Sequence, residues 1–336
     1  MSWSTQQGVR KLGDLAVQHG GTIRQAKLSW KAHGTLSPDK DNVILYPTSY
    51  SAQHADLEWL IGPDSVLDPG RWFIVIPDMF GNGLSSSPSN TADYPLVTAY
   101  DNVHAQRDLL RILWGIEHLH CVYGWSMGAQ QAYHWAALFP NAVSRVVINC
   151  GSARTATHNQ VFLRALMATL EAAPEHQGGG RFSGEPRAAL RAFARIYAAM
   201  ALSQDFYRED LHLLALGAPD LETFLQRDWE ARFQQRHAAD LYAQLRTWDS
   251  GDISNNDHFH GDLRAALQAI EARVLLMPGT TDQYFRVADN AAELPYLARG
   301  KLAPIPSIWG HRAGNPVQNP ADAQFIRDQV RALLDS

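Results

Sequence analysis

Cysteine is scarce in this chain, and its scarcity excludes two kinds of site. Only Cys121 and Cys150 occur among 336 residues. Two isolated cysteines cannot form a disulfide framework, and their spacing is not that of a zinc site. Both fall on apolar stretches, so we expect them to be small residues of the buried core.

Strong charge of one sign and long apolar runs are also missing. The net charge is -5 and no basic run exceeds a few residues, which argues against nucleic acid and anionic membranes as partners. No apolar run reaches the length of a membrane span. Residues Met1–Gln7 do not combine a basic segment with an apolar core, so no signal peptide is predicted. We therefore expect a soluble, cytoplasmic protein.

Hydrophobic residues make up 46% of the chain, enough for a large core, in one elaborated α/β domain or in two smaller domains. Short apolar runs alternate with helical segments, which predicts an α/β fold with a mostly parallel sheet covered on both faces. Two runs around Gly20-Gly21 predict an antiparallel leading hairpin over residues 14–34. The other expected strands are Asn42–Tyr46, Trp72–Pro77, Cys121–Tyr123, Val143–Asn149, Val274–Met277 and Lys301–Ile305.

Residues 151–262 differ from the rest, because they have helical spacing and almost no strand-like run. An insertion between parallel strands is expected to cover the strand ends, where α/β sheets bind ligands. We predict a core of residues 1–150 and 263–336 with an inserted helical cap of residues 151–262; a helical domain without a role at the site is the alternative. Apolar cap residues, expected in a partly hydrophobic pocket or in the cap's own core, are Phe162, Phe193, Tyr197, Met200, Phe206, Tyr207 and Trp229.

The most informative motif is Gly124-Trp125-Ser126-Met127-Gly128, which lies between an apolar run and a helical pattern. Strand, G-x-S-x-G and helix in this order are typical of a nucleophile elbow. The turn is tight, so small residues are needed two positions before and two positions after the serine. The following helix directs the positive end of its dipole at the serine hydroxyl. An ordinary strand-to-helix turn is the alternative.

A serine nucleophile needs a base and an acid that orients the base. Asp282 follows the strand expected at Val274–Met277, and His311 follows the last expected strand. The order Ser126, Asp282, His311 is that of the α/β hydrolases. His311 would take the serine proton near neutral pH, and Asp282 would fix the histidine tautomer. Taken singly, Asp282 could cap a helix, and His311 could be one of 14 histidines without chemistry.

Two backbone N–H groups are expected to form an oxyanion hole for the developing negative charge. Met127 supplies one from the elbow. Ser49 is predicted to supply the other, with Thr48 and Tyr50 as alternatives, because Pro47 has no N–H.

No cofactor and no metal are predicted. Gly81-Asn82-Gly83 lacks the third, helix-opening glycine of a dinucleotide site. The pairs His118/His120 and His258/His260 have no acid or cysteine at ligand spacing beside them.

Together these residues resemble the α/β-hydrolase-fold enzymes typified by homoserine O-acetyltransferase. The resemblance runs over most of the chain and implies the Ser126–Asp282–His311 triad, a ping-pong acyl-enzyme mechanism and a homodimer. The segments that carry it are Lys27–Leu36, Asn42–His54, Asp101–Gln106, Gly115-Ile116, the elbow through Phe139-Pro140, and Ser152–Arg154.

The substrate-binding positions depart from that family. The resemblance implies that Arg195, in a cap helix, binds a substrate carboxylate, but the family's tyrosine seven positions later is Leu202 here. The family's aspartate after the catalytic histidine, which holds the substrate's ammonium group, is Arg312 here. A guanidinium repels an ammonium, so homoserine is not expected as acceptor, and Arg195 with Arg312 would suit a carboxylate-bearing substrate. A solvent-facing Arg312 is the alternative.

Two enzymatic interpretations share this chemistry, and both make a small acyl compound the partner. In the first, favoured by the altered acceptor residues, a small ester or amide, carboxylate-bearing ones included, acylates Ser126 and water removes the acyl group. In the second, an acyl-CoA acylates Ser126 and a hydroxyl or amine accepts the acyl group. A non-catalytic ligand-binding protein on the same fold is a third interpretation.

Overall fold

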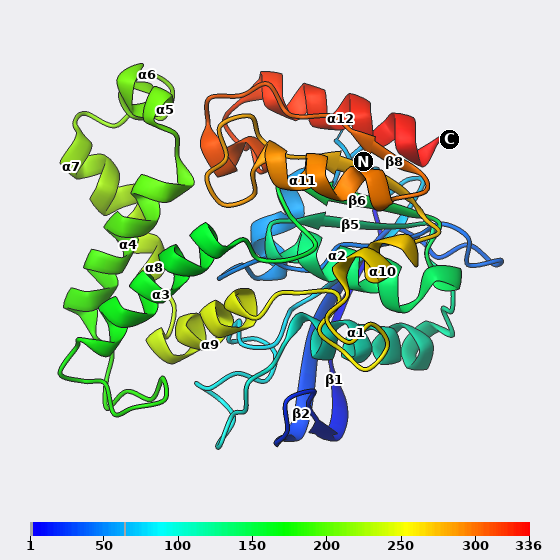
Figure 1. The fold of residues 1–336 in the computed structure, drawn as a ribbon, viewed down its shortest axis with the longest axis horizontal. Coiled ribbons are helices and arrows are strands. Elements are labelled where there is room, and N and C mark those ends of the chain that lie inside the picture. The colour runs from blue at the N-terminus through cyan, green and yellow to red at the C-terminus, as the bar shows by residue number, and fades with distance from the viewer. Residues whose placement is uncertain (1–2, 64) are drawn as a thin grey trace.

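A computed structural model describes residues 3–63 and 65–336 (Figure 1). Its central feature is one eight-stranded sheet. The strands are β1 (Thr5–Ala16), β2 (Thr22–His33), β3 (Val43–Leu45), β4 (Phe73–Pro77), β5 (Cys121–Trp125), β6 (Arg145–Asn149), β7 (Arg273–Met277) and β8 (Gly300–Leu302). Their spatial order is β1-β2-β4-β3-β5-β6-β7-β8. β1–β2 and β2–β4 pair antiparallel and the other neighbours pair parallel, which confirms the predicted fold class.

Helices cover both faces of the sheet. The parallel strands are buried on both faces, so alternate residues enter different hydrophobic clusters. In β7, Val274 and Leu276 join a cluster that includes α1 and α2, whereas Leu275 and Met277 join one that includes α12. These helices and the shorter ones of the core are α1 (Ala99–Trp114), α2 (Met127–Leu138), α10 (Leu263–Gln268), α11 (Val287–Glu293), α12 (Pro320–Leu334), η1 (His54–Leu60), η2 (Pro140–Ala142), η4 (Leu294–Tyr296) and η5 (Gly310–Gly314).

The leading hairpin is longer than predicted. β1 begins at Thr5, whereas the sequence placed its start at Asp14. Most β1 side chains are exposed, because the strand lies at the edge of the sheet, so its apolar periodicity is weak. The turn forms where the glycine pair predicted it, with positive φ at Gly20 (84°) and Gly21 (93°).

The helices of residues 157–249, which follow β6, lie together to one side of the sheet, at the left of Figure 1. They share a third hydrophobic cluster, which also includes Tyr284 and Trp309 from loops after β7 and β8. No helix of the described ranges is long and apolar enough to cross a bilayer. The helices of this segment are α3 (Thr157–Glu171), α4 (Arg187–Ala201), α5 (Gln204–Arg208), α6 (Leu211–Leu214), α7 (Leu221–Phe224), the π-helix η3 (Leu225–Glu230), α8 (Ala231–Phe233) and α9 (Ala238–Asp249).

A buried carboxylate ties α11 to the chain that leads into this helical segment. Glu293 accepts hydrogen bonds from Tyr133 Oη (2.7 Å), the Ala153 N–H (2.7 Å) and Asn290 Nδ2 (2.8 Å). Burial nevertheless raises the pKa of Glu293 to about 7. The charged form is therefore disfavoured in the folded state relative to the unfolded chain.

This shift predicts a pH-dependent stability. Between the ordinary value of 4.5 and the folded value of about 7, the folded state holds more protons at Glu293, so stability falls as pH rises through that window. The fall is of order 3 kcal/mol. Glu293→Gln removes the titrating group and should flatten this part of the curve, as measured by urea unfolding at about pH 5 and pH 8. The exposed Glu117→Gln should keep the wild-type slope; equal slopes in all three proteins would contradict the assignment.

Candidate active site

Ser126 lies where the sequence placed it, between β5 and α2. Its backbone is strained, with φ 58° and ψ −126°. The Ser126 N–H donates to Asn149 O at the end of the adjacent β6 (3.0 Å). The side chain is thereby held at the carboxyl edge of the parallel strands.

The glycines on either side of Ser126 are required by close backbone approach. A Cβ on Gly124 would lie 2.3 Å from Gly128 O, and a Cβ on Gly128 would lie 2.7 Å from Pro47 O. Neither position accepts a side chain without moving the backbone, in agreement with the small residues predicted for a tight turn. Gly151 is constrained in the same way, since its Cβ would meet Ala129 Cβ at 2.3 Å.

Asp282 and His311 form a buried hydrogen-bonded pair. His311 Nδ1 lies 2.7 Å from Asp282 Oδ2, and the two side chains are 5% and 0% exposed. Asp282 Oδ1 accepts hydrogen bonds from the N–H groups of Tyr284 (2.8 Å) and Phe285 (3.3 Å). The carboxylate is therefore fixed by the loop after β7, and it orients the imidazole from behind.

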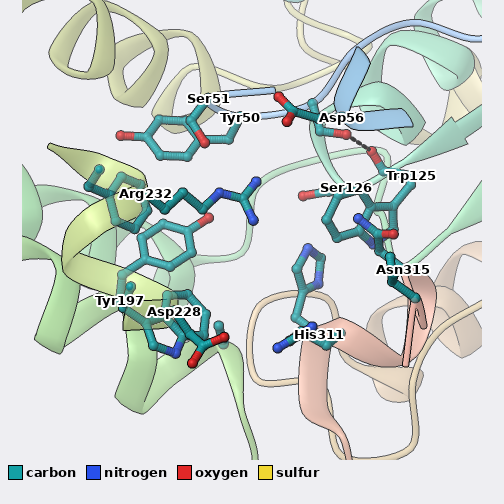
Figure 2. Close-up of a pocket in the computed structure, with 16 residues that line it drawn as sticks. Tyr50, Ser51, Asp56, Trp125, Ser126, Tyr197, Asp228, Arg232, His311 and Asn315 are labelled. Carbon is teal, nitrogen blue, oxygen red and sulfur yellow. Dashed lines mark hydrogen bonds between the residues drawn. The ribbon is translucent and has the colours of Figure 1, made fainter. Parts of the chain in front are cut away.

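The second nitrogen of the imidazole, Nε2, is available for proton transfer. The ring stacks on Trp125, with 5.2 Å between ring centroids, and meets the Tyr284 ring edge-on. His311 Nε2 is buried and has no hydrogen-bond partner among the described residues. Figure 2 shows Ser126 and His311 facing the same cavity, without a hydrogen bond between them. Catalytic hydrogen bonds often tighten only when substrate binds, so this arrangement suits a base that awaits a proton.

The loop after β3 contacts the elbow directly. Ser49 Oγ donates to Trp125 O (2.6 Å). The N–H groups of Ser49 and Met127 donate to no acceptor in the described part of the chain. The Thr48 N–H already donates to Pro77 O (3.3 Å), which removes it from the candidates, whereas the Tyr50 N–H is also without a partner. Two free N–H groups near the serine are what an oxyanion hole requires.

A cavity of about 280 Å³ lies in front of Ser126 and His311. Besides His311, its aromatic lining comes from Tyr50, Trp125, Tyr197, Trp229 and Phe233. Tyr50 and Tyr197 stack with 5.7 Å between ring centroids. This volume is at the low end for ligand sites and suits a small molecule. Of the seven apolar cap residues named from the sequence, Tyr197 and Trp229 line this cavity; the rest belong to or pack against the third hydrophobic cluster.

The two arginines expected to bind substrate have different surroundings. Arg312 lines the cavity. Arg195 is not among the lining residues, and its guanidinium is paired with Glu230 (2.6 Å) and Glu222 (3.0 Å). The structure thus keeps Arg312 as a candidate and gives Arg195 two partners within the protein.

Sequence reasoning missed Asp228 and Arg232, which line the cavity from η3 and α8. Nothing in Leu225–Phe233 forms a motif, and helical spacing alone does not say which face meets a ligand. Tyr50 was named from the sequence only as an alternative oxyanion donor, and the structure adds that it lines the cavity.

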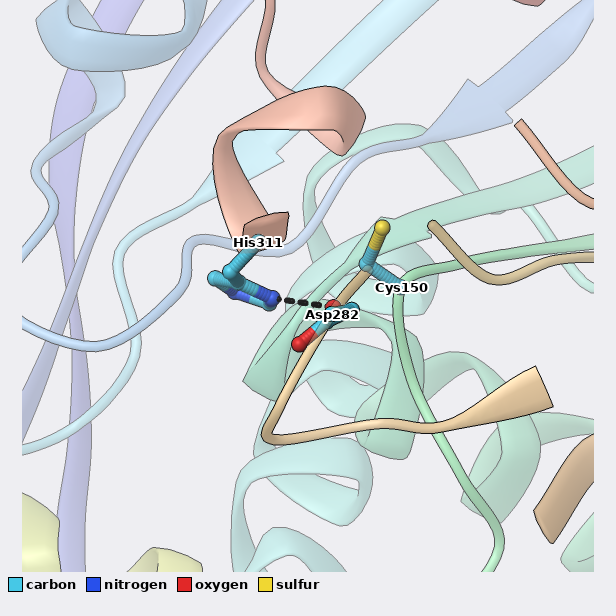
Figure 3. Close-up of side chains that lie close together, drawn as sticks. All are labelled: Cys150, Asp282 and His311. Atoms are coloured by element: carbon cyan, nitrogen blue, oxygen red, sulfur yellow. Dashed lines mark hydrogen bonds and ion pairs between the residues drawn. The ribbon is translucent and has the colours of Figure 1, made fainter. Parts of the chain in front are cut away.

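Both cysteines are free and buried, as expected. Cys150 lies beside the Asp282–His311 pair, and these three residues are the one group of potential metal ligands found among the described residues (Figure 3). Burial, and to a smaller degree the charge of Asp282, raises the pKa of the Cys150 thiol far above its ordinary value. His311 Nδ1 is hydrogen-bonded to Asp282 Oδ2. This contact is the one expected between the base and the acid of a catalytic triad.

Comparison with known proteins places the chain among hydrolases. The family model of the alpha/beta hydrolase fold matches residues 52–301. A probable esterase of Corynebacterium glutamicum is 38% identical over 309 residues, which cover 89% of this chain and 88% of that protein. An ethyl acetate hydrolase of Pseudomonas veronii is 35% identical over 331 residues, or 96% of this chain and 93% of that protein.

A solved structure and more distant relatives extend this comparison. An acetylester hydrolase from Corynebacterium glutamicum superposes with a TM-score of 0.93 at 35% identity, covering 98% of this chain and 96% of that chain. Homoserine acyltransferases also match but at lower identity; a homoserine O-acetyltransferase of Acidiphilium cryptum is 28% identical over 340 residues, or 89% of this chain and 88% of that protein. The esterases are thus the more similar of the two groups.

Proposed function

Because this chain is a serine hydrolase of the alpha/beta hydrolase fold family, we propose that it hydrolyses short-chain acetyl esters through an acyl-enzyme on Ser126. The observation that carries the proposal is that His311 Nε2 is buried, faces the same cavity as Ser126 and has no hydrogen-bond partner among the described residues, while His311 Nδ1 is bonded to Asp282. Relatives at 35–38% identity over most of the chain are esterases, which supports hydrolysis as the reaction.

Each step follows from one of these groups. His311 Nε2 takes the Ser126 proton as Oγ attacks the ester carbonyl. The carbonyl oxygen becomes an oxyanion, and the N–H groups of Ser49 and Met127 would stabilise it. His311 returns its proton to the departing alcohol, and Asp282 stabilises the imidazolium formed in between. Water, activated by His311 in the same way, then releases the acid.

The size and lining of the cavity support a small substrate. A volume of about 280 Å³ admits an ester of few carbon atoms. Tyr50, Tyr197, Trp229 and Phe233 provide apolar contact for the acyl or alkyl parts. We propose that the segment 151–262 acts as a cap, because it supplies three of these four aromatic residues.

The pairing of Arg195 favours hydrolysis over acyl transfer to an amino acid. In the acyltransferases that the sequence resembles, the matching arginine holds the acceptor's carboxylate. Here Glu222 and Glu230 already occupy the guanidinium. An acceptor carboxylate would have to displace them, at the cost of leaving charges unpaired. Homodimer formation and a cytoplasmic location stay predictions from the sequence.

A comparison of acyl donors tests the proposal. The purified protein should release acetate from ethyl acetate without any added acceptor. It should release little CoA from acetyl-CoA, with or without homoserine. Homoserine-dependent CoA release faster than ester hydrolysis would overturn hydrolysis in favour of transfer, and no turnover of either donor would favour a non-catalytic binding protein.

A further inference from the structure

Two arginines that line the cavity form no ion pair with any carboxylate of the described residues. Arg232, in α8, and Arg312, in η5, form no ion pair and no side-chain hydrogen bond with any described residue. The Arg312 guanidinium lies 5.9 Å from the centroid of the Trp309 ring. Arg232, Asp228 and Tyr207 are near enough to influence its pKa. Figure 2 shows the Arg232 side chain extending from the cap toward Ser126 and His311.

The carboxylates that line the same cavity do not balance these charges. Asp56 accepts a hydrogen bond from Arg236 (3.0 Å) and one from the Gln53 N–H (2.9 Å). Asp228 is paired with Arg227 (2.8 Å). Each acid therefore already has a cation of its own, and the cavity in front of the nucleophile carries an excess of positive charge.

This excess is unfavourable in the absence of an anion. Burial, and then the charge of Arg232, lowers the pKa of Arg312 to about 10, and the nearby Asp228 offsets only part of this shift. Arg312 is still cationic at neutral pH, but two guanidiniums share a partly enclosed space and repel each other. A bound anion would remove the repulsion and fill the unused donors of both side chains.

The positions of the arginines indicate which part of an ester the anion belongs to. The acyl oxygen is expected at the N–H groups of Ser49 and Met127. The departing oxygen must lie at His311 Nε2, from which it takes its proton. Arg312 follows His311 directly in η5 and lines the same cavity, which favours the alcohol portion of the substrate as the place of the anion.

We propose that this cavity selects acetyl esters whose alcohol portion carries a carboxylate, that is, acetylated small hydroxy acids. Arg232 and Arg312 are then specificity-determining residues that bind the carboxylate while Ser126 attacks the acetyl carbon. Arginine suits this task because its planar group donates two parallel hydrogen bonds to a carboxylate. The inference rests on the proposed esterase activity and names its substrate class.

The test compares charged and neutral esters of matched shape. In the wild-type protein, kcat/KM for acetoxyacetate should exceed that for its neutral amide, acetoxyacetamide, by about tenfold or more. Arg232→Gln and Arg312→Gln should each reduce this ratio several-fold, and the double variant should bring it close to one. Arg232→Lys should keep part of it, because the charge remains. High salt should lower the wild-type ratio.

Controls separate this inference from the proposed function and from loss of folding. Arg208→Gln, at an exposed position in α5, should keep the wild-type ratio. The ratio is taken within each variant, and thermal unfolding checks that each variant is folded.

A wild-type ratio near one, or a ratio unchanged in the double variant, would overturn the inference. So would a charge preference confined to the acyl portion, measured with monoethyl malonate and its neutral amide. Failure to hydrolyse any ester, ethyl acetate included, would instead overturn the proposed function.

Discussion

Ser126→Ala is expected to abolish ester hydrolysis, lowering kcat by about 10⁵-fold or more. The variant removes the only atom that attacks the ester in the proposed mechanism, while the cavity and the oxyanion N–H groups stay in place. Because alanine is smaller than serine and the elbow backbone is held by Asn149, the fold should survive. Initial rates of acetate release from ethyl acetate measure the effect, and thermal unfolding reports the fold.

A matched serine variant makes this result specific. Ser250→Ala removes a half-buried hydroxyl at the end of α9, where Ser250 Oγ donates to Thr247 O (3.0 Å). It should retain wild-type rates. Ser126→Ala with more than a few per cent of the wild-type rate would contradict the assignment of the nucleophile.

The second large effect is expected from Asp282→Asn, with a loss of about 10⁴-fold in kcat. An amide Nδ2 placed at 2.7 Å from His311 Nδ1 would donate to this nitrogen. The proton of the neutral imidazole would then sit on Nε2, which could no longer accept the serine proton. The Asn Oδ1 can keep the hydrogen bonds from Tyr284 and Phe285, so the loop should hold its shape.

Comparing kcat with the unfolding temperature of this variant separates a loss of histidine orientation from a loss of folding. Asp282→Asn should lose kcat while its unfolding temperature changes little, and Asp249→Asn, at a carboxylate paired with Arg164 on the surface, should behave as wild type. A loss below about tenfold would mean that Asp282 does not control the histidine tautomer.

The sheet and the elbow were predictable because their signals are local. Parallel strands buried on both faces appear as short continuous apolar runs, and a tight strand-to-helix turn admits only small residues around Ser126. β1 was only partly predictable: from Thr5 to Lys11 it lies at the sheet edge with exposed side chains, so burial leaves no pattern in the sequence.

The helices of residues 157–249 were predictable, but the side chains that they present to the cavity were not. Whether Arg195 or Arg232 reaches the cavity depends on which face of its helix meets the core. The direction of the Arg195 side chain is determined by ion pairs with residues far away in the sequence. Arg195 pairs with Glu222 and Glu230, which are 27 and 35 residues away. Nor does the sequence show that Asp56 and Asp228 have cations of their own, because their partners are known only from the fold.

The central claim is that the Ser126 hydroxyl becomes the nucleophile when His311 accepts its proton. Mass spectrometry of the protein after reaction with a fluorophosphonate probe tests it most directly. The account predicts one adduct, located by peptide mapping at Ser126, that forms at a much lower rate in His311→Gln. An adduct at another residue, no adduct on the folded protein, or equally fast labelling in His311→Gln would contradict it.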